Sequence, residues 1–152
     1  MRKFRTLLIL ALGLAVSTGY AADAKILKVL PHFLDQKGRH SLSPSLYERD
    51  AYQAQLRTHP ELVSGLRFDV QWKANKTGKK KLRMKLELRG SKAGSKMVTV
   101  EEDVQFKGRL FTAWARLPLA KKDFNALGGL NAWRATLWEG DQQISELKSF
   151  LW

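Results

Sequence analysis

The sequence contains no cysteine among its 152 residues. This absence excludes disulfide bonds, cysteine-bound metal sites, a thiol nucleophile and a lipid-attachment cysteine. Long apolar runs are almost as scarce, because the one clear example, Leu7–Val16, has ten residues where a membrane-spanning helix needs roughly 20. Acidic residues are also few, with 14 Asp and Glu against 27 Lys and Arg. The composition therefore predicts a basic protein without disulfides.

The start of the chain has the pattern of a secretory signal peptide. A basic beginning, formed by Arg2, Lys3 and Arg5, precedes the apolar run, and small residues follow it. We expect residues 1–21 to be removed by cleavage after Ala21, with cleavage after Ala24 as the alternative. The mature protein is then predicted to be exported, to a periplasm or to the outside of the cell, and not to span a membrane.

The positive charge is concentrated in one part of the chain. Between Lys73 and Lys96 there are ten Lys and Arg residues and a single acidic residue, Glu87. A local positive field of this size attracts anionic partners, although it carries no information about the fold. This segment is therefore where an anionic partner is expected to bind.

Two strands with alternating apolar and polar residues flank the start of this segment. The alternation runs from Gly65 to Ala74 and returns over residues 79–89, which indicates two strands that each bury one face. A turn at residues 75–79 separates them. We interpret the pair as a β-hairpin in which Asp69 lies opposite Lys85, because charges of opposite sign then face each other across the strands.

The remaining pattern indicates an antiparallel β-sandwich. Further strands are predicted over residues 96–106, 110–119, 130–138 and 142–152, with one helical turn near Phe124 and a β-bulge at Glu102. Short connections without alternating helices are typical of such a fold. Over residues 62–152 the layout resembles immunoglobulin and fibronectin type III domains, without the cysteine pair of true immunoglobulin domains. The resemblance implies a fold and no function.

Residues 22–61 are expected to form an N-terminal arm that carries a short edge strand over 26–30 and one short helix over 44–57. Ser43 followed by Pro44 fits an N-cap with proline at the first helical position, and Ser45 with Glu48 fits a capping box one step later. An apolar stripe along the helix predicts that it packs across an open end or edge of the sandwich. The stripe consists of Tyr47, Ala51 and Ala54, with Tyr52 and Leu56 beside it.

Four of the five tryptophans can be sorted by the face of the strand on which each lies. Trp72 and Trp133 fall on apolar faces and are expected in the core, whereas Trp114 falls on the face opposite its apolar neighbours. Trp138 lies near a hairpin tip beside acidic residues, where we expect it to pack at the rim of the core. A sugar-stacking platform at Trp138 is the alternative.

No pattern predicts catalysis, a metal or another cofactor. The three histidines, His32, His40 and His59, are spaced unlike metal ligands, and we interpret them as packing or surface residues. The sequence holds no G-x-S-x-G motif, and the acidic residues are scattered apart from the run Glu101–Asp103. That run is better explained as neutralising nearby positive charge. We therefore predict that the protein is not an enzyme.

The candidate site is a row of cations along the predicted hairpin, with Leu82 and Met84 on the opposite face of the strand. Its residues are Lys73, Lys79, Lys81, Arg83 and Arg89. One or two lysines are enough to protect an edge strand from aggregation, so this row is an excess. We predict that it binds an anionic polymer of the cell envelope or a protein partner, and no specific nucleic acid. The leading function is a binding or assembly module of the cell envelope.

The alternative is a structural subunit whose basic face only keeps the protein soluble. Its contacts with protein partners would then run through an edge strand or through the N-terminal arm. The arrangement of the charges decides between the two readings. A row that pairs with Glu101–Asp103 would be neutralised internally, whereas a row open to solvent would be available to a partner.

Overall fold

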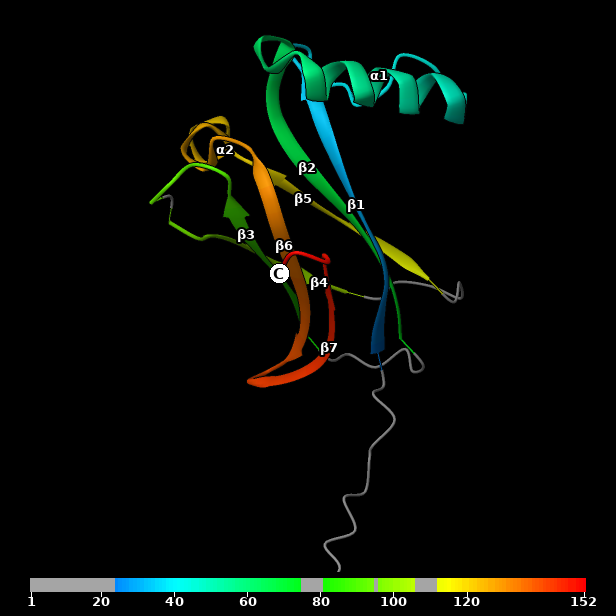
Figure 1. Ribbon diagram of the computed structural model, residues 1–152. Helices are drawn as coiled ribbons and strands as arrows, with labels where there is room; N and C mark the ends of the chain where they lie inside the picture. Colours follow the sequence, from blue (N-terminus) through cyan, green and yellow to red (C-terminus); the bar gives the residue numbers. More distant parts are fainter. Residues whose placement is uncertain (1–23, 75–80, 95, 106–111) are drawn as a thin grey trace, which may run out of the picture.

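The computed structural model describes residues 24–74, 81–94, 96–105 and 112–152. In these residues two antiparallel β-sheets lie face to face, and two helices lie at one end of them (Figure 1). The protein is therefore mainly β, as the sequence predicted, with the layers of a β-sandwich. The signal peptide predicted over residues 1–21 lies outside the described residues.

The first sheet has the strand order β1-β2-β5, and the second has the order β4-β3-β6-β7. The first consists of β1 (Ala24–Asp35), β2 (Val63–Ala74) and β5 (Ala113–Leu119). The second consists of β3 (Leu82–Gly90), β4 (Val98–Val104), β6 (Leu130–Glu139) and β7 (Gln142–Lys148). The helices are α1 (Leu46–Thr58) and α2 (Lys121–Leu127), and a 3-10 turn spans Pro60–Leu62.

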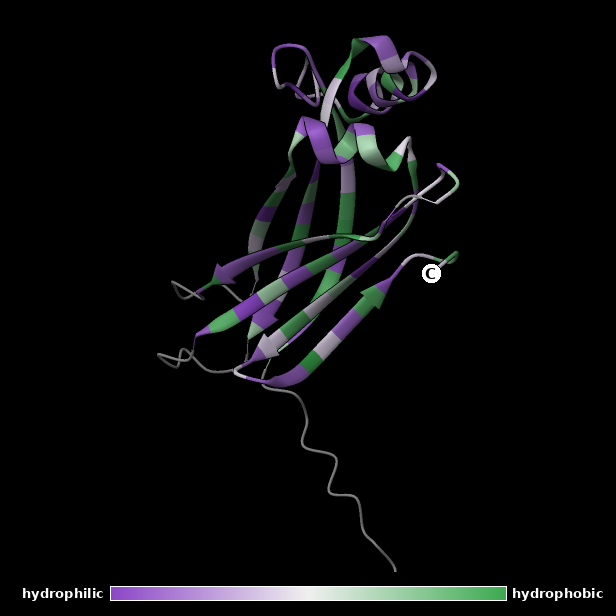
Figure 2. Cartoon of the chain, turned by 90° about the vertical axis from the view of Figure 1, so that its left-hand side faces the viewer, coloured by the Kyte–Doolittle hydropathy of each residue, from purple (hydrophilic) through white to green (hydrophobic). Residues whose placement is uncertain are grey.

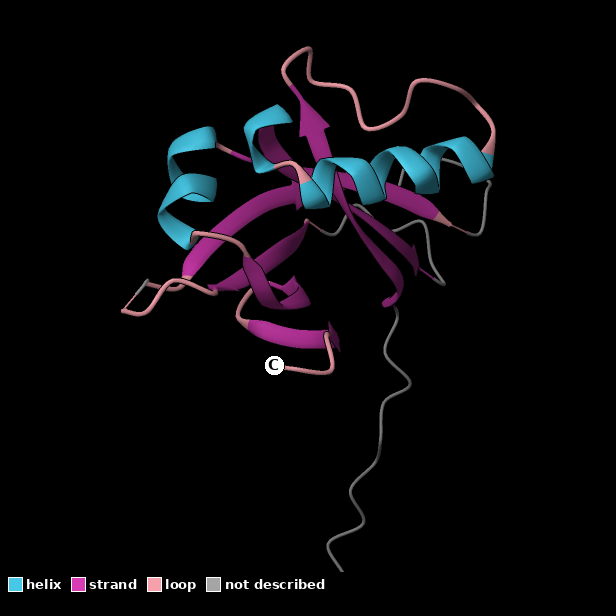
Figure 3. Cartoon of the chain, turned by 45° about the horizontal axis from the view of Figure 1, so that its top comes forward, coloured by secondary structure: helices cyan, strands magenta, loops and turns pink. Residues whose placement is uncertain are grey.

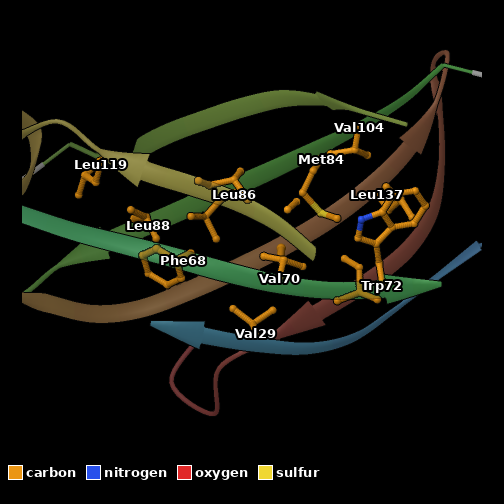
Figure 4. Close-up of a cluster of buried hydrophobic side chains, with 14 of the residues drawn as sticks. Val29, Phe68, Val70, Trp72, Met84, Leu86, Leu88, Val104, Leu119 and Leu137 are labelled. Atoms are coloured by element: carbon orange, nitrogen blue, oxygen red, sulfur yellow. The ribbon is translucent and has the colours of Figure 1, made fainter. Parts of the chain in front are cut away.

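The core lies between the two sheets and is built from alternate residues of each strand. Figure 2 shows hydrophilic and hydrophobic residues alternating along the strands. Phe68, Val70 and Trp72 of β2 point inward and meet Met84 and Leu86 of β3 (Figure 4). All five are 0% or 1% exposed, and burying each such side chain stabilises the fold by roughly 1.5–3 kcal/mol. The other face of each strand is left for polar residues.

The hairpin predicted between the strands now labelled β2 and β3 is wrong. β2 pairs with β1 and β5, whereas β3 pairs with β4 and β6. Asp69 therefore lies opposite Arg116, and Lys85 lies opposite Glu101. Alternation predicts which side chains are buried but not which strand lies alongside. With the two strands in opposite sheets, their apolar faces cover each other. The predicted turn at 75–79 lies outside the described residues.

β1 is a strand of the sandwich rather than part of an arm outside it. The edge strand expected over residues 26–30 extends over twelve residues and pairs with β2 along its length. Pro31 does not end it, because on an edge strand the missing N–H removes no ladder hydrogen bond. On its other side, β1 approaches β7, where the Ile26 backbone N–H donates to Ser145 Oγ at 3.0 Å. This contact links the two sheets along one side.

β4 runs beside β3 without the bulge predicted at Glu102. The register between the two strands is continuous from Val98 to Val104. Glu102 shares the inward parity of its apolar neighbours, yet it is exposed. It lines a cleft of about 390 Å³ between β4 and β5, together with Trp114 and Arg116. A charged side chain is tolerated there because this side of the sandwich is open to water.

α1 lies across one end of the molecule, beside the ends of β1 and β2 (Figure 1), where the sequence predicted that it packs. Its N-cap is Ser45, whose side chain accepts a hydrogen bond from the Glu48 backbone N–H. The cap predicted at Ser45 is confirmed, and the one predicted at Ser43 is wrong, because the helix begins at Leu46. The predicted contact face is wrong. Tyr47 is 84% exposed, and Ala51 and Ala54 are exposed as well.

Hydrogen bonds to β1 select the face of α1 that is buried. The Gln53 side-chain amide accepts from the Phe33 backbone N–H at 2.8 Å and donates to the Phe33 carbonyl oxygen at 2.9 Å. One turn away, Leu56 is 1% exposed, and the Tyr52 hydroxyl donates to Asp35 at 2.8 Å. Hydrophobic periodicity could not reveal this face, because polar side chains make two of its three main contacts.

The hairpin and the helical turn predicted for the C-terminal half are confirmed, but the strand predicted over residues 142–152 is shorter, because β7 ends at Lys148. β6 and β7 form an antiparallel hairpin across residues 140–141, and α2 supplies the helical turn near Phe124. α2 ends at Gly128, whose φ of 67° is the left-handed conformation that glycine adopts without strain. Trp72 is buried in the core, and Trp133 packs against it while partly buried.

Candidate functional site

The residues predicted to bind anions do not form one surface. Arg83 and Arg89 lie on the outer face of the second sheet, and Lys81 is exposed just before β3. Lys73 lies on the outer face of the first sheet, on the other side of the core. Lys79 is outside the described residues. The fold therefore separates a row that looked continuous in the sequence.

The outer face of the second sheet neutralises most of its own charge. Arg83 lies opposite Asp103 and approaches Glu101 at 3.8 Å between Nε and Oε2. On the same strand, Lys85 Nζ lies 3.3 Å from Glu87 Oε1. From β6, Arg134 Nη2 contacts the other carboxylate oxygen of Glu87 at 2.6 Å. The acidic run on β4 thus meets Arg83, and the single acid of β3 meets Lys85 and Arg134.

Glu87 is the centre of this ion cluster. Its side chain is 6% exposed, and such burial alone would raise the pKa of a carboxyl group. The hydrogen bonds and charges of Arg134 and Lys85 outweigh burial, so the pKa of Glu87 is lowered. The carboxylate therefore stays ionised. It forms ion pairs with Lys85 and Arg134, which would otherwise be available to an external anion.

The guanidinium of Arg89 forms a cation–π contact with an aromatic ring. Its guanidinium carbon lies 4.0 Å from the centroid of the Trp152 ring, and the guanidinium of Arg134 lies 4.8 Å from the same ring. Cations attract the face of an indole in this arrangement. The second sheet thus presents a mixed surface in its described residues. Its cations are Arg83, Lys85, Arg89, Arg134 and Lys148, and its acids are Glu87, Glu101, Asp103 and Glu146.

The outer face of the first sheet carries a different combination of side chains. We call it the cationic face and define it by Lys25, Lys28, Gln71, Lys73, Trp114 and Arg116. The strand register places Lys25 beside Lys73, and it places Gln71 between Lys28 and Trp114. Two residues further along β5, Arg116 lies beside Asp69 of β2. These residues come from three strands, and the sequence pattern did not predict that they lie together.

Trp114 is exposed on this face. It shows 49% of its surface to solvent, although a tryptophan of a sandwich strand usually contributes to the core. Gln71 lies next to it in register, and Arg116 follows on the same side of β5. An open indole beside an amide and a guanidinium can stack on a flat ring while donating hydrogen bonds at its edge.

The positive charges of this face are not neutralised by ion pairs with other described residues. Asp69, on the same outer side of β2, accepts two hydrogen bonds from Arg67, at 2.8 Å and 2.9 Å, and contacts His32 at 3.5 Å. Asp69 therefore pairs with Arg67 and His32 and not with Arg116. Glu102 and Asp103 of β4 line the cleft that also holds Trp114 and Arg116, but neither forms an ion pair with Arg116. Within the described part of the chain, four cations of the face form no ion pair. They are Lys25, Lys28, Lys73 and Arg116.

Two histidines close one end of the cationic face. His32 is 7% exposed, and its ring centroid lies 4.9 Å from that of His40. Burial lowers the pKa of both imidazoles, and the charge of Asp69 offsets this only in part. His59, at the end of α1, contacts Glu61 instead. No group of three such side chains in the described ranges is placed to hold a metal ion.

The signals for this face were present in the sequence but scattered. Trp114 and Arg116 alternate with buried Ala115 and Leu117, which marks them as outward-facing. Nothing local shows that they lie beside Lys73 on the neighbouring strand. Trp138, the tryptophan considered for sugar stacking, is half-buried and donates from Nε1 to Thr136 Oγ1 at 2.8 Å.

Comparison with protein-family models, with curated proteins and with solved structures found no match. Across the residues that the structure describes, no helix is long and apolar enough to cross a membrane. Function is therefore inferred from the geometry of the two outer faces.

Proposed function

We propose that the protein is an exported, non-enzymatic binding or assembly module of the cell envelope whose cationic face holds an anionic polysaccharide. The observation that carries this proposal is the exposed Trp114 on a face with four cations that lack ion-pair partners among the described residues. A sugar ring stacks on the indole, and its carboxylate or other anionic groups pair with Lys73 and Arg116. Gln71 supplies hydrogen bonds to hydroxyl groups.

A polysaccharide suits this face better than a single-stranded nucleic acid. Proteins that hold nucleic acid strands stack successive bases on several aromatic side chains. Here one exposed aromatic residue, Trp114, lies among the outward-facing residues that the structure describes on β1, β2 and β5. The signal peptide predicted over residues 1–21 also places the mature protein where anionic envelope polysaccharides occur. Nucleic acid binding is thus a weaker reading of the same charges.

The proposal includes an immunoglobulin-like or fibronectin type III-like fold. With β1 as strand A, the strands A, B and E fall in one sheet and C, F and G in the other, as in immunoglobulin domains. β4 joins the C-F-G sheet, where variable-type domains carry their additional strand. This strand order supports the resemblance, and it leaves both outer sheet faces available as binding surfaces.

Affinity for a carboxylated polysaccharide tests the function directly. We expect the protein to bind polygalacturonate and to release it as salt rises, because contacts between exposed charges are screened. A variant with Lys73→Gln and Arg116→Gln should lose at least tenfold in affinity, and Trp114→Ala should weaken binding even at high salt. The matched control is Arg83→Gln with Lys148→Gln, which removes two cations from the other sheet.

The control variant should bind like the parent. Equal losses in the two double variants would mean that only net charge matters, and the cationic face would not be the site. Binding of Trp114→Ala with the parent's affinity would remove the argument for a sugar. A neutral polysaccharide that binds as well as polygalacturonate would contradict the role given to the cations.

The alternative function is a structural subunit joined to protein partners through an edge strand or the N-terminal arm. Its edge-strand form has less support. β5 carries Pro118, which cannot donate a hydrogen bond to an added strand. β4 exposes Glu101, Glu102 and Asp103, and charged residues on an edge disfavour pairing with another chain. The free side of β1 already contacts β7. The edges of both sheets are thus protected against strand addition.

A further inference from the structure

The two helices lie at the same end of the sandwich (Figure 3). A cavity of about 660 Å³ lies there, lined by residues of α1, α2 and the ends of β1, β2 and β6. Sites for small molecules usually measure roughly 300–1,000 Å³. None of its lining residues belongs to the cationic face. The cavity is therefore a second candidate site with its own chemistry.

The walls of the cavity are mainly apolar. Its principal wall residues are Phe33, Leu56, Val63, Phe124 and Leu130. The rings of Phe33 and Phe124 meet edge to face, with their centroids 6.3 Å apart. This contact joins a strand of the first sheet to α2. Water forms few hydrogen bonds with such walls, so its displacement by an apolar chain is favourable.

One charged residue lines the cavity. Arg57 is exposed on the last turn of α1, and its guanidinium carbon lies 5.8 Å from the centroid of the Phe33 ring. No acidic residue is part of the lining, and Arg57 forms no ion pair with any residue that the structure describes. Asn125 of α2 is the other polar side chain of the lining. An apolar cavity thus carries an unneutralised cation.

We propose that this cavity binds an amphiphile with a single apolar chain and a carboxylate head group. The chain lies against Phe33 and Phe124, and the carboxylate accepts two hydrogen bonds from the Arg57 guanidinium, whose geometry matches it. A cationic head group is repelled by Arg57. A neutral head group leaves the guanidinium without an ionic partner. This binding is independent of the polysaccharide function.

Calorimetric titration of the protein with octanoate, decanoate and dodecanoate tests the proposal, each below its micelle concentration. One methylene contributes about 0.8 kcal/mol on burial, so affinity should rise about fourfold for each one added until the cavity is filled. Decanol should bind at least tenfold more weakly than decanoate, and a quaternary ammonium with the same chain should not bind. Affinity that does not change with chain length would overturn the proposal.

Two single variants separate the head group from general charge. Arg57→Gln should lower the affinity for decanoate about tenfold and leave that for decanol unchanged. Lys122→Gln is the control, because Lys122 is exposed on α2 and does not line the cavity. Equal decanoate affinities in the two variants would contradict the assignment of Arg57. Arg57→Gln should still bind polygalacturonate like the parent, so failure of one proposal leaves the other intact.

Discussion

Arg89 lies with its guanidinium carbon 4.0 Å from the centroid of the Trp152 ring, so a cation predicted to bind anions is held by an indole instead. Arg134 approaches the same ring from β6, at 4.8 Å. Trp152 thereby joins the segment after β7 to two neighbouring strands. This contact explains why Arg89 is a poor candidate for an external ligand.

Removing the Trp152 ring should destabilise the fold. We expect Trp152→Ala to lower the free energy of unfolding by about 1–2 kcal/mol, from the lost cation–π contacts and the lost apolar contact. Urea denaturation followed by fluorescence measures this change. Phe150→Ala is the control, since Phe150 is fully exposed and should alter stability little. Equal effects of the two substitutions would show that the stacking contributes nothing.

The buried carboxylate of Glu87 should matter more than the exposed acids on β4. Glu87→Gln leaves Arg134 and Lys85 without their anion, and we expect a loss of about 2 kcal/mol. Glu101→Gln removes a half-exposed pair at 3.8 Å and should cost less than about 0.5 kcal/mol. Thermal melting of both variants at neutral pH compares them. A larger effect at Glu101 would contradict the central place of Glu87.

The attachment of α1 should depend on one polar side chain. Gln53→Leu leaves the Phe33 backbone N–H and carbonyl group without partners, which we expect to cost about 2–3 kcal/mol. Gln55→Leu on the same helix is the control, because Gln55 is exposed. Limited proteolysis should cut the Gln53→Leu variant within or beside α1 first. Resistance equal to that of the control would mean that apolar contacts alone hold the helix.

The histidine pair predicts a loss of stability in mild acid. The pKa of His32 and that of His40 are lowered from 6.5 in the folded protein, mainly by burial, so the folded state binds fewer protons than the unfolded chain. Stability is then complete above pH 6.5 and falls as the pH drops below it towards the folded pKa values. Melting temperatures measured from neutral pH downwards should show this decline.

A second pair of variants tests whether these two histidines cause the decline. His32→Gln with His40→Gln should flatten the curve in that range, whereas His59→Gln should leave it unchanged because His59 is exposed. Protonation of Asp35 and Glu87 affects a lower range. Their pKa values are depressed in the folded state, so their contributions are lost only as the pH falls through acidic values.

The structure also favours one of the two cleavage sites of the proposed signal peptide. Ala24 is 3% exposed and lies opposite Ala74 at the start of β1. Cleavage after Ala21 keeps this contact, whereas cleavage after Ala24 removes it. Mass spectrometry of the secreted protein should therefore find Ala22 as the first residue. A chain that begins at Lys25, with an unchanged melting temperature, would show that the contact is dispensable.

Local features of this protein could be read from the sequence. Alternation identified the inward faces of β2 and β3, including Trp72 and Met84, and turn residues identified the β6–β7 hairpin. Ser45 and Glu48 likewise indicated the N-cap of α1. Each of these depends on residues close together in the chain, so their physical causes act within a few residues.

Tertiary structure decided which strands are neighbours, and with that which charges meet. Arg83 faces Asp103 because β3 lies beside β4, and Lys73 joins Lys25 because β2 lies beside β1. The alternating pattern is compatible with several strand orders, since it specifies the buried face of a strand and not its partner. The pairing depends on how apolar faces from distant segments cover one another. The basic row of the sequence was therefore divided between two sheets, and a cationic face with an exposed tryptophan was assembled from strands far apart in the chain.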